Sequence, residues 1–386
     1  MAGSYASSEA VDATVKAARA AMADFLHCAP DEVVFGPTMT ALTYHLARSL
    51  RNSGRIGAGD NVVIDPLGHG ANVWTWVQLA KACGAEVRWL PVAQDGAAPG
   101  VRALDCTLDP RPEALEGVVD ERTRLLCMGV ASNGHGSVHD VASLLANAKQ
   151  RSGGSHLSFL DAVHYAPHAA LDVGALGVDF LACSPYKFFG PHCGTLFGRR
   201  ELLSTLPVDK LDCADEGLPS EANCWMSRFE IGTGNYEALA GTRAAVDYLA
   251  GLGVSFGGAD ADAPRRAQLE AAWRAIGAHE AELKQRFLEA ASKVPGLSLL
   301  GVTDTSRLHA RTTTFAVRKE GVSPADLAAF LCERGIWTTA GNHYAGFWTE
   351  HGGGLANVEE GMCRIGMLHY NTVDEVDRVI SALKDA

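Results

Sequence analysis

The stretch that decides the fold is Leu181-Ala182-Cys183-Ser184-Pro185-Tyr186-Lys187-Phe188-Phe189-Gly190-Pro191. Its apolar start predicts a buried strand, and the later glycine and prolines interrupt regular structure, so Lys187 is expected on a turn at a strand end. Burial beside aromatic rings lowers the pKa of an amine and favours a nucleophile or a Schiff base with an aldehyde. The same residues also fit a lysine whose stem lies on the rings while its head reaches water.

A second segment places an acid at the end of another predicted strand. Ser158-Phe159-Leu160-Asp161-Ala162-Val163-His164 reads as a short strand that ends at Asp161. In open α/β sheets ligands bind at the carboxyl ends of strands, so Asp161 and Lys187 can face one pocket. An acid that keeps a pyridine nitrogen protonated and a lysine that bonds to an aldehyde are what pyridoxal 5'-phosphate requires. This cofactor is therefore expected.

The segments around Asp161, Lys187 and Arg364 resemble the class V aminotransferase group of fold-type I pyridoxal-phosphate enzymes, and most closely its cysteine desulfurase-like branch. The resemblance implies an α/β fold, with a mostly parallel sheet covered by helices on both faces and a smaller α+β C-terminal domain. The alternation of strands and helices in the first two thirds favours the same sheet. We expect a large cofactor-binding domain over residues 1–250 and a small domain over 251–386. A helix near residues 9–27 is a candidate to pack with the small domain.

Family members usually carry several dozen residues before that first helix, including a segment at the substrate entrance. This chain starts later than they do, so either a truncated start or a more open pocket is expected.

Composition bears on partners and compartment. The net charge of -12 argues against nucleic acid or an anionic membrane surface as a partner. Ten cysteines without CxxC spacing are typical of reduced thiols in a cytoplasmic protein. No apolar run reaches the ~18 residues that a membrane span needs, and the start has no export signal. A small-molecule substrate and a cytoplasmic location are expected.

The resemblance also implies which residues hold the cofactor. Met39, through its N–H, and Thr40 would bind the phosphate at a helix start, where free N–H groups favour anions. Thr40 fits an ordinary N-cap equally well. By the same resemblance, His69 would stack on the pyridine ring, and Asn133 and His164 would hydrogen-bond the ring oxygen. Ser184 and Tyr186 would also contact the phosphate.

Thr233 lies in a segment that reaches the neighbouring subunit in the family, which implies a homodimer with shared active sites. For the substrate, the resemblance implies that Arg364 grips the α-carboxylate in a bidentate way. Asn133 and His343 are expected to contact the same substrate. Lys187, Asp161, His69 and Tyr344 are the expected catalytic residues.

Tyr344 occupies the position where cysteine desulfurases carry their nucleophilic cysteine. Without a thiolate there, β-elimination from an S-substituted L-cysteine is expected, giving thiol, pyruvate and ammonia. The phenol either protonates the departing sulfur or fills the space of the cysteine. The chain is also similar to sulfur-tailoring enzymes of lincosamide antibiotic biosynthesis, which suggests secondary metabolism. The residues expected to shape the pocket for the sulfur substituent are Trp337, His343, Tyr344, Phe347 and Trp348.

Three rival hypotheses stay open at this point. The first is decarboxylation coupled to deamination, or an epimerase-like reaction. The second is desulfuration through another cysteine, with Cys193 and Cys363 nearest. The third, a metal site from Asp161, His164 and His168 on one helical face with Glu230, is weaker, and no metal is expected.

Overall fold

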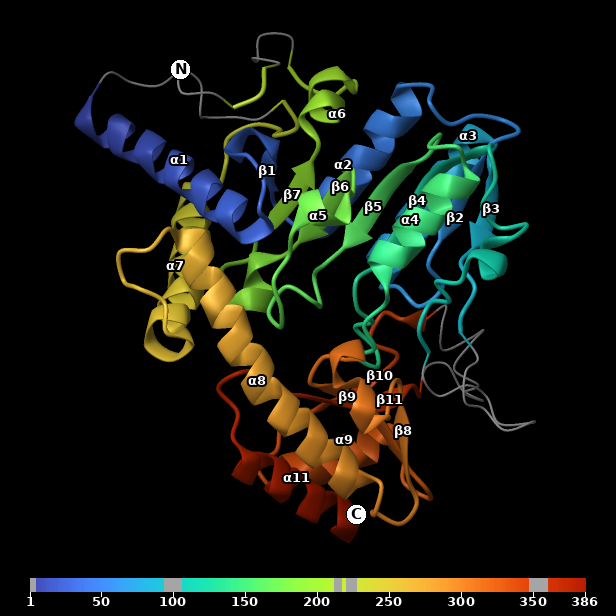
Figure 1. The fold of residues 1–386 in the computed structure, drawn as a ribbon, viewed down its shortest axis with the longest axis vertical. Helices are drawn as coiled ribbons and strands as arrows, with labels where there is room; N and C mark the ends of the chain where they lie inside the picture. The colour runs from blue at the N-terminus through green and yellow to red at the C-terminus, as the bar shows by residue number, and fades with distance from the viewer. Residues whose placement is uncertain (1–4, 94–105, 212–216, 220–227, 347–359) are drawn as a thin grey trace.

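Seven strands form the central sheet of the computed structural model, which describes the chain outside residues 1–4, 94–105, 212–216, 220–227 and 347–359. The strand order is β1-β7-β6-β5-β4-β2-β3 (Figure 1). Strands β2 to β6 run parallel, whereas β7 is antiparallel to both β6 and β1. Their bounds are β1 Val33–Gly36, β2 Asn61–Ile64, β3 Glu86–Trp89, β4 Thr123–Gly129, β5 Leu157–Asp161, β6 Phe180–Cys183 and β7 Gly194–Gly198.

Alternating side chains of the parallel strands enter two hydrophobic cores, one on each face of the sheet. In β4, Leu125 and Cys127 lie in one core while Leu126 and Met128 lie in the other. This period of two follows from the pleat, and burial of both faces explains the continuous apolar runs in the sequence. The helices that cover one face are α2 (Met39–Asn52) and α3 (Gly70–Cys83), and those on the other are α1 (Ala6–Leu26), α4 (Val141–Arg151) and α7 (Tyr236–Gly257). The expected α/β architecture is confirmed.

A second, antiparallel sheet forms the smaller C-terminal part, in the order β10-β11-β9-β8. Two helices, α9 (Pro324–Glu333) and α11 (Val373–Asp385), and the end of α8 share its hydrophobic core. The strand bounds are β8 Leu297–Leu300, β9 Thr314–Lys319, β10 Thr339–Gly341 and β11 Met362–Gly366. The expected small α+β region is therefore present.

Helix α8 (Arg265–Ala291) joins the two parts, as Figure 1 shows. Its first half contributes Leu269 and Trp273 to a core of the large sheet, and its second half contributes Leu283 and Phe287 to the small core. The predicted domain boundary at residue 250 stays a prediction. One helix of 27 residues thus fixes the spacing between the two sheets.

Helix α1 packs on the core of the large sheet and also touches α7 and α8, and the expectation that it packs with the small domain stays a prediction. Its buried side chains belong to the core of the large sheet, and Phe25 stacks on Phe188 with ring centroids 4.6 Å apart. Arg19, also on α1, is buried and bonds Glu230 at 2.6 Å. The helix therefore supports, from behind, the turn that carries Lys187.

Candidate active site

The carboxyl ends of β2, β4, β5 and β6 meet at one edge of the large sheet, because these strands are parallel. A cavity of about 630 Å³ lies there. It is lined by all but one of the residues that the sequence assigned to cofactor, substrate and catalysis, namely Met39, Thr40, His69, Asn133, Asp161, His164, Ser184, Tyr186, Lys187, His343, Tyr344 and Arg364.

Lys187 lies on a single 3-10 turn, η3 (Pro185–Phe188), that follows β6 directly. Gly190 closes this turn, and a Cβ there would meet Pro185 at 3.0 Å. The pKa of Lys187 is lowered, mainly by burial and secondly by the Arg364 cation, while Asp161 opposes the shift. An amine that is neutral more often than an ordinary lysine is suited to bond an aldehyde and to accept a proton.

Asp161 is 8 % exposed at the end of β5, and its Oδ1 accepts a hydrogen bond from the N–H of Val163 at 2.9 Å. Burial raises the pKa of this carboxyl to about 6, partly offset by that hydrogen bond and by Lys187. A cation placed against Asp161 would restore its ionised form. The predicted pyridinium nitrogen is such a cation, so the carboxyl fits the cofactor.

The start of α2 forms the predicted phosphate site. Thr38 is the N-cap, since its hydroxyl accepts from the N–H of Ala41 at 3.0 Å, so the alternative that Thr40 caps the helix is wrong. Strand β7 touches this helix start at Gly194, where a Cβ would lie 2.3 Å from the carbonyl carbon of Thr38. The first N–H groups of a helix lack intrahelical acceptors and attract anions. Together with the buried Ser184 hydroxyl, they fit a phosphate.

Asn133 links the two sheets at the rim of the cavity. Its Nδ2 donates to the carbonyl oxygen of His343 at 2.6 Å, and its own carbonyl oxygen accepts from Nη1 of Arg364 at 2.8 Å. The carboxamide Oδ1 is buried, and no described residue hydrogen-bonds it. A buried acceptor without a donor is costly, so a bound polar group is expected to satisfy it.

The histidines that line the cavity are held neutral. Burial, with added repulsion from Lys187 and Arg364, lowers the pKa of His69 to about 4. The Nδ1 of His69 accepts from the N–H of Ala71 at 3.0 Å, which caps α3 and leaves the proton on Nε2. Burial and nearby cationic groups also lower the pKa of His164 well below its ordinary value. A neutral imidazole is suited to stack on a cationic ring.

Residues 2–379 match the family model for class-V aminotransferases. The chain belongs to this family. It is 30 % identical to a cysteine desulfurase of Pectobacterium carotovorum, over 99 % of this chain and 84 % of that protein. It is 31 % identical to a probable cysteine desulfurase 2 of Mycobacterium leprae, over 97 % of this chain and 81 % of the relative.

The structure of a cysteine desulfurase from Thermococcus onnurineus matches with a TM-score of 0.80 at 22 % identity, covering 99 % of this chain and 86 % of the other. A cysteine desulfurase from Escherichia coli matches with a TM-score of 0.76 at 23 % identity, over 99 % and 86 % of the two chains. These likenesses show the fold. The family depends on pyridoxal 5'-phosphate, so this class-V aminotransferase is a pyridoxal-phosphate enzyme.

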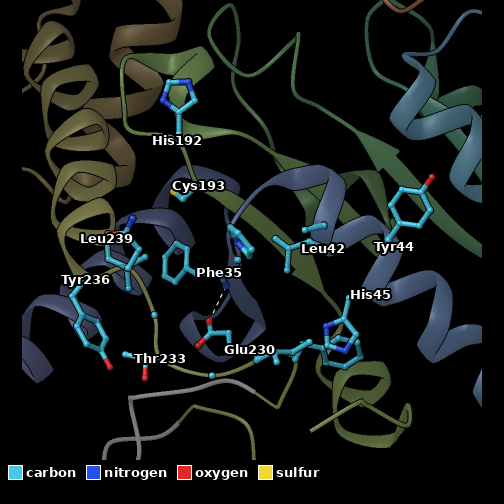
Figure 2. Close-up of a pocket in the computed structure, with 18 of the residues that line it drawn as sticks. Phe35, Leu42, Tyr44, His45, His192, Cys193, Glu230, Thr233, Tyr236 and Leu239 are labelled. Carbon is cyan, nitrogen blue, oxygen red and sulfur yellow. Dashed lines mark hydrogen bonds between the residues drawn. The ribbon is translucent and has the colours of Figure 1, made fainter.

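Thr233 is the predicted cofactor residue that does not line the cavity of its own chain. It faces a neighbouring cavity of about 590 Å³ that shares His192 with the first one (Figure 2). Beside it, the carboxylate of Glu230 accepts hydrogen bonds from the N–H of Phe35 at 2.7 Å and from Arg19. The dimer that Thr233 implied stays a prediction.

Two other predictions about the site are corrected. Trp337 is 89 % exposed and lies outside the cavity lining, so it does not shape the substituent pocket. The single helical face suggested for Asp161, His164 and His168 is absent, because residues 163–168 form turns, and His168 bonds Glu280 at 2.9 Å. Within the described ranges no group of metal-binding side chains gathers. Phe347 and Trp348 lie outside the described residues.

The sequence reasoning missed several lining residues, namely Gly68, Gly129, Ala131, Val163, His192 and Thr339. Gly129 ends β4, and Ala131 and Val163 follow the ends of β4 and β5. Their position after buried strands was the available signal, because the ends of parallel strands meet at one edge. Thr339 pairs with Arg364 across β10 and β11, which the sequence does not reveal.

None of the helices in the described part of the chain is long and apolar enough to cross a membrane.

Proposed function

We propose that this class-V aminotransferase is a carbon–sulfur lyase that acts on an S-substituted L-cysteine. With one water molecule, the substrate gives a thiol, pyruvate and ammonia. One observation carries the proposal: the cavity joins Lys187, Asp161 and Arg364, yet among its described lining residues no cysteine occurs. Tyr344, at the position where the resemblance places the nucleophilic cysteine of cysteine desulfurases, lines this cavity. The sulfur therefore leaves with its substituent.

The cationic side chain of Arg364 binds the substrate carboxylate. One of its nitrogens, Nη1, is fixed by the carbonyl oxygen of Asn133, which orients the plane of the guanidinium. Lys is a poor substitute for such a planar fork. With the carboxylate held here, the substrate's α-carbon is directed toward Lys187, which lines the same cavity.

Pyridoxal 5'-phosphate, when bound, supplies an electron sink for negative charge at the substrate's α-carbon. Asp161 would support this by holding the proton of the pyridine nitrogen, and His69 would lie over the ring. Lys187 takes the proton from the α-carbon. The Cβ–S bond then breaks with its electron pair on sulfur, and a proton from Tyr344 completes the thiol. Water hydrolyses the remaining three-carbon fragment to pyruvate and ammonia.

The cysteines nearest the site are poorly suited to accept sulfur. Cys363 is fully buried on β11, and burial raises the pKa of its thiol. Cys193 is 4 % exposed and lies 3.3 Å from the Thr242 hydroxyl, and burial likewise raises its pKa. A buried protonated thiol is a weak nucleophile. Cys213 and Cys224 lie outside the described residues.

The segment that carries Tyr344 is tied to both sheets. The N–H of Gly70 donates to the carbonyl oxygen of Tyr344 at 2.8 Å, and His343 is held by Asn133 on one side and by the carbonyl of Met362 on the other. The Tyr344 ring lies 5.2 Å from the ring of His69. These contacts favour a loop that stays in place as part of the cavity lining. They do not favour a mobile loop that carries sulfur away from the substrate.

We further propose a cytoplasmic homodimer with shared active sites, working in secondary metabolism. Support for the shared sites comes from Thr233, which lines the neighbouring cavity and is not among the lining residues of the cofactor cavity of its own chain. The secondary-metabolic role rests on the resemblance to lincosamide sulfur-tailoring enzymes.

The test follows the fate of sulfur. The cofactor-loaded protein is incubated with S-methyl-L-cysteine, and free thiol, pyruvate and the mass of the intact protein are measured. Equal amounts of thiol and pyruvate, with no sulfur added to the protein, support the lyase. Alanine with a methylthio group added to the protein, or alanine with a sulfur atom added to the protein when free L-cysteine is the substrate, would overturn it. Cys363→Ser and Cys193→Ser serve as controls and should keep full activity.

A further inference from the structure

Asp65 is a fully buried carboxyl directly after β2, beneath the floor of the cofactor cavity. Its Oδ1 accepts from the N–H of Leu67 at 2.6 Å, and its Oδ2 accepts from the N–H of Gly129 at 3.0 Å. Within the described residues it forms no ion pair. Both hydrogen-bond donors thus come from backbone at the edge of the cavity, one from β4 and one from the turn that leads to His69.

The position of Asp65 mirrors that of Asp161. Each follows or ends a parallel strand, is buried, and accepts a hydrogen bond from the N–H two residues later. Burial raises the pKa of both carboxyls to about 6, and Asp161 adds to the rise at Asp65. Gly129 lies between them, because the next N–H, that of Val130, donates to the carbonyl oxygen of Asp161 at 2.9 Å. The negative charge of Asp161 therefore acts on Asp65.

We propose that Asp65 is a positioning residue for the cofactor ring. Its carboxylate ties the turn that carries His69 to the end of β4, and it places a second negative charge beside Asp161. A protonated ring nitrogen at Asp161 is then stabilised by both acids. This role is independent of which reaction the enzyme performs on its substrate.

The other titratable groups that line the cavity at this edge are His69 after β2, Asp161 and His164 after β5, Tyr186 and Lys187 after β6, His192 before β7, His343 and Tyr344 after β10, and Arg364 on β11. The cations among them oppose protonation of the bound cofactor, whereas Asp65 and Asp161 favour it. Removal of the Asp65 charge should therefore make the ring nitrogen of the bound cofactor lose its proton at a lower pH.

The test is a pH titration of the ¹⁵N NMR shift of the ring nitrogen in Asp65→Asn loaded with cofactor that carries ¹⁵N at that position. We expect the midpoint to fall by about one pH unit, since a unit charge several ångströms away contributes on that order. The matched control is Asp179→Asn. Asp179 also accepts a backbone N–H, that of Ser158 at 2.8 Å, but at the start of the strands and so at the opposite edge of the same sheet.

A lower midpoint in Asp65→Asn alone supports the proposal. An unchanged midpoint in a folded Asp65→Asn, or an equal shift in the control, would overturn it. Circular dichroism checks the fold. Should Asp65→Asn fail to fold, Asp65→Ser keeps a neutral acceptor for the N–H of Leu67 and is expected to show the same shift.

Discussion

The guanidinium of Arg364 donates from Nη1 to the carbonyl oxygen of Asn133 at 2.8 Å, and this bond joins β11 of the small sheet to the end of β4 of the large one. Asn133 in turn holds His343 at 2.6 Å. The carboxylate-binding cation and the loop that carries Tyr344 are therefore fixed by the same residue. Substrate position and leaving-group position are set together at this point.

Arg364→Lys should weaken substrate carboxylate binding. Lysine keeps the charge but cannot hold Asn133 and both carboxylate oxygens in one plane. Loss of a charge-assisted hydrogen bond costs about 1.5 to 3 kcal/mol, so kcat/KM should fall about tenfold to a hundredfold. Steady-state kinetics with the substrate and with its carboxamide test this. An equal loss on the carboxamide would contradict the assigned role.

Lys187 should react at a lower pH than an ordinary lysine, because burial and Arg364 lower the pKa of its amine. Arg364→Gln removes a nearby cation, so the pKa of Lys187 should rise and reaction of the apoprotein with pyridoxal phosphate should shift to higher pH. The rate of cofactor uptake against pH measures this. Arg286→Gln, which removes a surface arginine paired with Asp377, is the control and should leave the profile unchanged. A profile unmoved by Arg364→Gln would refute the electrostatic coupling.

The variant Tyr344→Phe distinguishes two roles of the phenol: donation of a proton to the departing sulfur, and filling of space in the cavity. A general acid matters most when the leaving thiolate is strongly basic. We expect kcat for an S-alkyl cysteine to fall about tenfold or more, and kcat for an S-aryl cysteine to change little. Measurement of both substrates on one preparation controls for cofactor loading. Equal losses on the two substrates would mean that Tyr344 only shapes the cavity.

Shared active sites should allow two inactive variants to complement each other. Lys187→Ala removes the reacting amine, and Thr233→Asp places a negative charge against the partner's cofactor phosphate. After the two proteins are mixed and exchange subunits, half of the dimers carry one intact site, so activity should recover to about a quarter of wild type. Recovery of activity and the dimer mass are measured together. Dimers that exchange subunits without any recovery would speak against sharing.

The parts of the site that follow from local sequence were predictable. Asp161 and Lys187 end or follow buried apolar strands, and parallel strands bring such ends to one edge. The residue that caps α2 was harder to predict. Thr38 and Thr40 lie two positions apart and either can cap a helix, and only the hydrogen bond from the N–H of Ala41 to the Thr38 hydroxyl decides between them.

Other features depend on contacts that are distant in sequence. Asp65 is recognisable only because Gly129 lies against it, and α1 packs on the large core because Phe25 meets Phe188. Trp337 is of a residue type that often lines pockets, yet its side chain is exposed to solvent. Residue type alone does not distinguish such cases, since exposed aromatic side chains are common on protein surfaces.

The central claim is that the substrate's Cβ–S bond breaks while its carboxylate is kept. The most direct measurement uses an S-alkyl L-cysteine labelled with ¹³C at the carboxyl carbon, incubated in air with the cofactor-loaded protein, with Lys187→Ala as the control. We predict that all label consumed appears in pyruvate, matched by an equal amount of thiol, and that the control is inactive. Label in carbon dioxide, or in alanine, would contradict it.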